Sequence, residues 1–183
     1  MKENKFYEDA ARCGAWLGLA EVAFTALGAW KSSWLISLLH VVVFVTLLTL
    51  FTKRRAAQYA TADEGYSYGK CLKFIFFMSL FAGVLAGAYA IVASNFLYPE
   101  KFHEAIDKVI VTLSSTGMYA DSMLEQMKVL YEKMFFSPLW VVIVNVLSMI
   151  LEGVFFGLFV SAVARREPQM FGQKNESDEN ELI

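Results

Sequence analysis

Four long apolar stretches, separated by segments rich in charged residues, dominate the hydrophobic pattern of the chain. Each stretch is close to the roughly 20 residues that an α-helix needs to cross roughly 30 Å of hydrocarbon. Their apolar residues are continuous and do not alternate with polar ones, as they would in the strands of a transmembrane barrel. In lipid, a helix pairs its backbone N–H and C=O groups internally. The pattern therefore predicts four membrane-spanning helices, over about 12–30, 34–52, 72–97 and 139–164.

The segment 98–138, between the third and fourth predicted spans, is amphipathic. Apolar residues recur at helical spacing on both sides of Gly117, which predicts the end of a first helix there. Ser122 and Glu125 fit a capping box at the start of a second helix. We therefore expect an all-α fold, in which an integral membrane four-helix bundle carries an amphipathic helical hairpin between its third and fourth helices. The apolar positions of this hairpin are Phe102, Ile106, Val109, Ile110, Leu113, Met123, Met127, Leu130 and Met134.

Lysine and arginine residues are divided unequally between the two ends of this bundle. Eleven lie in the N-terminal segment, in the loop between the second and third spans, and after the fourth span, whereas five lie at Lys31 or within 98–138. Cationic residues favour the cytoplasmic side of a membrane. We therefore expect cytoplasmic N- and C-termini and an extracytoplasmic hairpin. Residues 1–167 would form a single four-pass domain, and the acidic segment 168–183 a disordered cytoplasmic tail.

Composition and motifs narrow the classes of function. The chain has 183 residues, of which 57% are hydrophobic, and its net charge of -2 gives no basic surface for nucleic acid. Its two cysteines, Cys13 and Cys71, fall at the cytoplasmic ends of helices, where a structural disulfide is not expected. The sequence contains no metal-ligand spacing, no glycine-rich phosphate loop and no nucleophile elbow. We therefore expect no enzymatic activity, no metal and no cofactor.

Small residues recur at intervals of three or four along the first, third and fourth spans. Lipid tails remove the hydrophobic drive between helices, so helices in membranes commonly pack through small residues that let two backbones approach. In the first span the stripe of small residues continues through Thr25 to Gly28. Packing within the chain is the expected role, and homodimerisation is the alternative. The candidate packing residues are Gly14, Gly18, Gly83, Gly87, Gly153 and Gly157.

Two of the spans carry a glutamate near the middle of the membrane, Glu21 and Glu152. An ionised carboxylate at that depth costs at least a few kcal/mol. Glu21 shares its face with the glycine stripe, so we expect it to point into the bundle. Asn145 lies on the face of Glu152, and His40 lies at the depth of Asn145. These four residues are expected to form a polar core, which acts either as a set of interhelical hydrogen bonds or as a proton relay or ligand pocket.

The order of several short motifs completes the pattern. Gly65-Tyr-Ser-Tyr-Gly69 precedes the third span, and Tyr98-Pro99 opens the amphipathic segment. Ser137-Pro138 begins the fourth span, which carries Glu152-Gly153 at its middle and ends in Arg165-Arg166. In these features the chain resembles, over roughly residues 10 to 167, the bacterial four-pass membrane family called domain of unknown function 4199. The resemblance implies a location in a bacterial inner membrane and implies no catalytic residues.

Two functions from different classes follow from these patterns. The first is a non-enzymatic structural or interaction protein of the cell envelope, surrounded by the lipid bilayer. The apolar faces of the hairpin would then cover each other or rest on lipid headgroups, or would dock an envelope protein or a second copy of the chain. The alternative is a small proton-coupled transporter or channel that uses Glu21 and Glu152.

Overall fold

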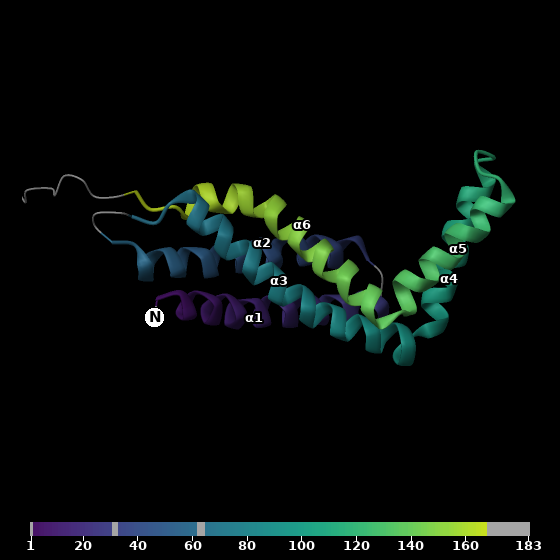
Figure 1. Cartoon of the computed structure of the whole chain (residues 1–183), viewed down its shortest axis with the longest axis horizontal. Helices are drawn as coiled ribbons and strands as arrows, with labels where there is room; N and C mark the ends of the chain where they lie inside the picture. The colour runs from purple at the N-terminus through teal and green to yellow at the C-terminus, as the bar shows by residue number, and fades with distance from the viewer. Residues whose placement is uncertain (1, 31–32, 62–64, 168–183) are drawn as a thin grey trace, which may run out of the picture.

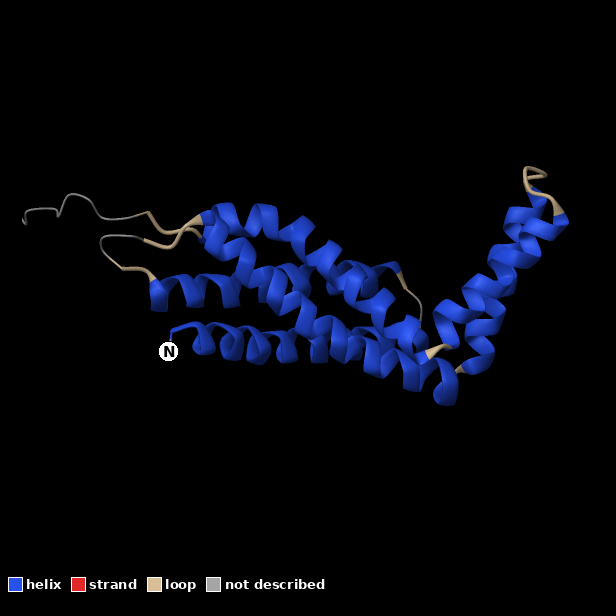
Figure 2. Cartoon of the chain, in the orientation of Figure 1, coloured by secondary structure: helices blue, strands red, loops and turns tan. Residues whose placement is uncertain are grey.

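The computed structural model describes residues 2–30, 33–61 and 65–167 of the chain. Helices joined by loops make up this part of the chain (Figure 2). The all-α class predicted from the sequence is therefore confirmed. The tail predicted over 168–183 and Lys31 lie outside the described residues.

Four of the helices are long and apolar enough to cross a membrane, as predicted. They are α1 (Lys2–Trp30), α2 (Trp34–Tyr59), α3 (Tyr68–Val92) and α6 (Pro138–Ala164). A short π-helix, η1 (Ala93–Leu97), extends α3. The first three helices also include polar turns beyond the predicted spans. These turns stay helical because lysine and arginine are good helix formers, although they lie outside the apolar stretches.

Helix α3 makes the most extensive contacts within the bundle (Figure 1). It packs mainly against α6 and α1, whereas α2 packs against α1 and α6 and only slightly against α3. The N-terminus and the end of α6 lie at one end of the bundle, called here the N-terminal end. The buried apolar core consists of Ala10, Leu17, Phe44, Leu48, Phe74, Ile75, Met78, Ala82, Met149 and Val160.

Glycines bring α3 close to both of its main neighbours. A Cβ atom on Gly14 of α1 would lie 2.5 Å from the carbonyl oxygen of Met78. A Cβ atom on Gly83 of α3 would lie 2.7 Å from the Cα atom of Val146 in α6. Any larger residue at these two positions would push a neighbouring backbone away. Neighbouring helices also lie within van der Waals reach of Gly18, Gly87, Gly153 and Gly157.

The stripe of small residues on α1 is shorter than predicted. A Cβ atom on Gly28 would have no neighbouring atom within 4 Å, and Thr25 is exposed. The close backbone approach of α1 to α3 therefore occurs at Gly14 and Gly18 and does not reach the last turns of α1. A cavity beside Thr25 separates the helices at that level.

Helices α4 (Pro99–Ser115) and α5 (Asp121–Phe136) lie side by side and project from the other end of the bundle (Figure 1). Each helix contributes one buried apolar residue, Ile106 and Leu124. Ring contacts also join the pair, between Phe102 and Phe135 and between His103 and Phe136. The apolar faces of the two helices therefore cover each other in part.

The turn between α4 and α5 agrees with one prediction and corrects another. Gly117 lies just beyond the end of α4 with a φ of 64°, a conformation that favours glycine. Helix α5 begins at Asp121 after Ala120, which has no side chain that could cap a helix. The capping box predicted at Ser122 and Glu125 is therefore wrong, because Ser122 already lies within the first helical turn. Asp121 instead places a negative charge at the helix N-terminus, where the helix dipole favours it.

Candidate functional site

Glu21 of α1 and His40 of α2 form a polar pair between their two helices. The Oε2 atom of Glu21 lies 2.5 Å from the Nε2 atom of His40, and the two side chains are 17% and 22% exposed. This distance is that of a hydrogen bond between the carboxyl group and the imidazole, and the pair carries no net charge when the carboxylate faces an imidazolium or the protonated carboxyl faces a neutral ring. A neutral pair is far less costly in an apolar environment than an unpaired ion.

The packing of α1 sets the direction of Glu21. Gly18, which lies three residues before Glu21, packs against Ala82 of α3. Residues three apart share a helix face, so this contact turns Glu21 toward the bundle. The ring of His40 lies 5.2 Å from that of Phe24 and 6.2 Å from that of Phe44. The hydrogen bond between Glu21 and His40 is therefore bordered by aromatic side chains.

The same pair joins to α1 a part of α2 that packs little elsewhere. Trp34 is 73% exposed, and Leu38 and Leu39 are each 54% exposed. Along α2, fully buried residues begin only at Phe44. His40 therefore contributes a polar contact that holds the first turns of α2 against α1.

A small cavity lies next to the pair, between α1, α3 and α6. Its volume is about 100 Å³, which accommodates about three water molecules at roughly 30 Å³ each. Both Glu21 and Glu152 line this cavity, so the structure brings the two glutamates to one shared cavity. In the described part of the chain, no residue from the charged ends of the helices lines it. The other lining residues are Val22, Thr25, Ala86, Tyr89, Ala90, Asn145, Ser148 and Met149.

The remaining members of the expected polar core take different roles. The Nδ2 atom of Asn145 donates a hydrogen bond of 2.8 Å to the carbonyl oxygen of Val141, one turn earlier in its own helix. Asn145 therefore lines the cavity without joining two helices. Glu152 is half-buried, and within the described residues its side chain makes no direct hydrogen bond. Of the four residues, Glu21 and His40 form the interhelical hydrogen bond, and Glu152 and Asn145 line the cavity with polar groups.

Sequence reasoning missed a second polar cluster, at the N-terminal end of the bundle. Arg55 of α2 is only 6% exposed and forms an ion pair with Asp9 of α1. Its Nε atom donates to the Tyr66 hydroxyl at 3.2 Å, and the Tyr59 hydroxyl donates to Oδ2 of Asp9 at 2.9 Å. Burial raises the pKa of Tyr66, which keeps this phenol neutral. The cluster therefore links α1, α2 and the segment before α3.

Aromatic rings enclose the Arg55 guanidinium. Its Cζ atom lies 4.3 Å from the ring centroid of Tyr59, 4.8 Å from that of Phe6 and 4.9 Å from that of Phe74. A cation over a ring face is attracted by the negative face of the π-system. This attraction and the Asp9 ion pair together compensate for the burial of the charge.

One signal in the sequence identifies this arginine. Leu48, Thr52 and Arg55 follow each other at intervals of four and three, so they share one helix face, and all three are buried. Taken only as a cytoplasmic charge, Arg55 is indistinguishable from the neighbouring Lys53 and Arg54, which are exposed. When the helical periodicity of α2 is extended past the end of its apolar stretch, it places Arg55 on the buried face and Lys53 and Arg54 on the exposed faces.

Among the described residues, no three His, Cys, Asp or Glu side chains gather closely enough to hold a metal ion. No curated protein and no solved structure matches the chain. The family model described as protein of unknown function (DUF4199) matches residues 12–166. This range includes all four residues of the expected polar core and most of the four long helices. The chain is therefore a member of the DUF4199 family.

Proposed function

We propose that this protein is a non-enzymatic structural and interaction protein of a bacterial inner membrane. One observation carries the proposal: Glu21 and His40, the two residues of the predicted polar core that meet between helices, satisfy each other. Hydrogen bonds between membrane helices stabilise a bundle by about 0.6–2 kcal/mol each. The pair then serves to hold α2 against α1, and its chemistry requires no substrate.

The orientation of the bundle follows from its charges. Lys5, Arg12, Arg54 and Arg55 belong to the N-terminal end of the bundle, and so do the basic residues around α3 and after α6. Cationic residues concentrate on the cytoplasmic side of membranes. Both termini then lie in the cytoplasm, and α4 and α5 form an extracytoplasmic hairpin.

The hairpin is the surface through which we propose that the protein meets an envelope partner protein. Val111, Met118 and Leu130 are 67%, 75% and 58% exposed. These apolar side chains stand among six acidic and four basic residues between Pro99 and Phe136. The excess of carboxylates favours a partner that presents a basic and apolar surface. Contact with lipid and self-association are the alternative roles of these exposed apolar residues.

Site-specific photocrosslinking in intact cells tests this surface. A photoreactive residue at Val111 or at Leu130 is expected to yield one discrete protein adduct of a mass above that of the chain. Phe159 of α6 is 64% exposed and provides a control position within an apolar helix. Adducts that contain only lipid, or identical adducts from the hairpin and from Phe159, would contradict the proposal. An adduct at twice the mass of the chain would assign the surface to a second copy.

Proton-coupled transport is the second candidate, because Glu21 and Glu152 line the same cavity. The structural proposal and the transport proposal predict different effects when these glutamates are replaced by glutamine. Glutamine keeps hydrogen bonds but carries no transferable proton, so Glu21→Gln and Glu152→Gln should leave a structural protein folded and functional. Proton-dependent flux in reconstituted vesicles that disappears in these folded variants would replace the structural proposal with transport.

A further inference from the structure

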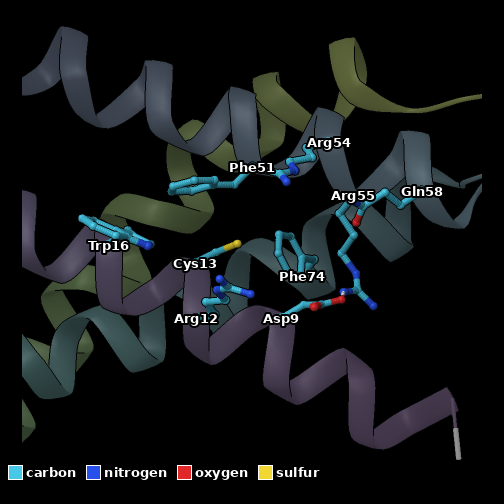
Figure 3. A pocket seen from close by; sticks show the side chains of 9 residues that line it. All are labelled: Asp9, Arg12, Cys13, Trp16, Phe51, Arg54, Arg55, Gln58 and Phe74. Atoms are coloured by element: carbon cyan, nitrogen blue, oxygen red, sulfur yellow. Dashed lines mark hydrogen bonds and ion pairs between the residues drawn. The ribbon is translucent and has the colours of Figure 1, made fainter.

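A crevice opens between α1 and α2 at the N-terminal end of the bundle (Figure 3). Its volume is about 260 Å³, and Phe74 of α3 forms part of its wall. It presents three guanidinium groups and one carboxylate. Its remaining lining residues are Asp9, Arg12, Cys13, Trp16, Phe51, Arg54, Arg55 and Gln58.

Two of the three positive charges in this crevice are uncompensated. Arg55 is neutralised by Asp9. Arg12 and Arg54 are exposed, and neither forms an ion pair or a hydrogen bond with the described residues. Arg12 comes from α1 and Arg54 from α2, so their guanidinium groups approach the crevice from opposite walls. Paired guanidinium groups suit a phosphate, whose oxygens accept their donors two at a time.

The crevice changes from polar to apolar along its length. Figure 3 shows Trp16 and Phe51 toward one side and Asp9, Arg55 and Gln58 toward the other. Trp16 is 62% exposed, and it lies on α1 beyond Arg12 in the direction of the apolar stretch. Phe51 lies on α2 before Arg54, again on the apolar side. The arginines therefore stand where a lipid headgroup meets its acyl chains, with aromatic side chains on the side of the bilayer.

The size of the crevice limits what it holds. Pockets that enclose a whole drug-sized molecule measure about 300–1,000 Å³, so this crevice suits a small headgroup whose remainder stays outside. Basic pockets between membrane helices bind phosphorylated headgroups of lipids. We propose that this crevice binds the phosphate of an anionic phospholipid, with Arg12 and Arg54 on the phosphate and an acyl chain beside Trp16 and Phe51. The ion pair of Arg55 with Asp9 joins the two walls of the crevice.

Fluorescence quenching in nanodiscs tests this site with the full chain. A variant with Trp30, Trp34 and Trp140 replaced by phenylalanine leaves Trp16 as the reporter. Brominated phosphatidylglycerol and brominated phosphatidylcholine serve as the probes, because bromine quenches a tryptophan that it contacts. We assign about fivefold in anion binding to each arginine that contacts the phosphate, equivalent to about 1 kcal/mol per basic residue. Two arginines then predict a preference of about 25-fold for phosphatidylglycerol at Trp16.

Variants that remove single positive charges test which residues cause the preference for phosphatidylglycerol. Arg54→Gln is expected to lower the preference by about fivefold, and Arg12→Gln with Arg54→Gln to abolish it. Lys53→Gln removes the same charge from the adjacent residue, which does not line the crevice, and is expected to change the preference by less than about twofold. The thermal unfolding midpoint of each variant checks its fold. If the double variant does not fold, Arg54→Gln compared with Lys53→Gln still decides.

Three results would overturn the assignment. Equal quenching by the two lipids would mean that the crevice does not select a phosphate-bearing anionic lipid. An equal loss in Lys53→Gln and Arg54→Gln would reduce the preference to the general surface charge. Competition by millimolar glycerol 3-phosphate, with the same dependence on Arg12 and Arg54, would assign the site to a soluble phosphate ester. The crevice lies at the opposite end of the bundle from the hairpin, so crosslinking and lipid preference succeed or fail independently.

Discussion

His40 meets Glu21 at a level of the bundle where α2 is otherwise largely exposed. Their facing atoms lie 2.5 Å apart, and the fully buried part of α2 begins only at Phe44. A polar contact thus supports a helix segment that has few apolar contacts within the chain. The pair is the best-defined interhelical contact of the predicted polar core.

The first prediction concerns this pair. Glu21→Ala leaves the imidazole of His40 without its partner and is expected to lower the stability of the bundle by about 1–2 kcal/mol. Glu21→Gln retains a hydrogen-bonding side chain and should lose less than half as much. The first turns of α2 should loosen most, which hydrogen exchange over 34–43 would record, with α3 as the internal control. Exchange over 34–43 that is unchanged in Glu21→Ala relative to the unmodified chain would show that the pair does not hold α2.

The second prediction concerns the interface between α3 and α6. Gly83→Ala places a Cβ atom 2.7 Å from the Cα atom of Val146, so the helices must separate, at a cost of about 1–3 kcal/mol. Gly28→Ala is the matched control, because no atom lies within 4 Å of its Cβ position. It should be neutral or slightly stabilising, since alanine is the better helix former. Thermal unfolding in detergent compares the two variants, and a similar loss in both would reject close packing at Gly83.

The third prediction concerns Arg55. Arg55→Lys keeps the positive charge but removes the planar guanidinium that contacts Tyr66 and faces three rings. A destabilisation of about 1–3 kcal/mol is expected, typical of a disrupted buried network. Arg54→Lys, one residue away and exposed, should change the stability by less than about 0.5 kcal/mol. The midpoints of chemical unfolding distinguish a geometric requirement from a requirement for charge alone, which would leave Arg55→Lys unchanged.

The fourth prediction concerns pH and the pairing of α4 with α5. Within α4, the hydrogen bond from Lys108, one turn later in the same helix, lowers the pKa of Glu104 from its ordinary value of 4.5. The bond to Asp107 raises the pKa of Lys128 above 10.5. The Glu104 pair therefore contributes fully above about pH 4.5 and is lost as the pH falls through the lowered pKa. The Lys128 pair contributes fully below about pH 10.5 and is lost as the pH rises through the raised pKa.

A pair of spin labels, one on α4 and one on α5, measures this effect in the full chain. The distance distribution should be narrow below about pH 10.5 and broaden as the pH rises through the raised pKa of Lys128, because Lys128 and Asp107 join the two helices whereas Glu104 and Lys108 both lie on α4. A concentration of 1 M salt should weaken this dependence because the pair between the helices is exposed. Lys128→Gln removes the pair between the helices and should abolish this pH dependence, whereas Lys108→Gln removes only a pair within α4 and serves as the control. Unchanged pH dependence in Lys128→Gln would assign the effect to other groups.

Much of the secondary structure was readable from the apolar pattern. A continuous apolar run of about 20 residues admits only a helix in lipid, because each backbone polar group needs a partner within the segment. The end of α4 before Gly117 followed from local conformational preference. The start of α5 did not follow, because Ser122 and Asp121 are both acceptable in a first helical turn. The extended backbone of Ala120 places the start of the helix at Asp121.

The tertiary structure alone decided which polar residues meet. The sequence determined four apolar helices. It placed Glu21 and Glu152 near the middle of the membrane and His40 and Asn145 at a similar outer depth, since depth follows from position along a helix. It did not determine that Glu21 pairs with His40, because partner choice depends on the order and rotation of the helices. Those are set by close contacts such as that of Gly83 with Val146, which join residues far apart in the chain. For the same reason, Arg55 became a buried anchor while Lys53 and Arg54 beside it stayed exposed.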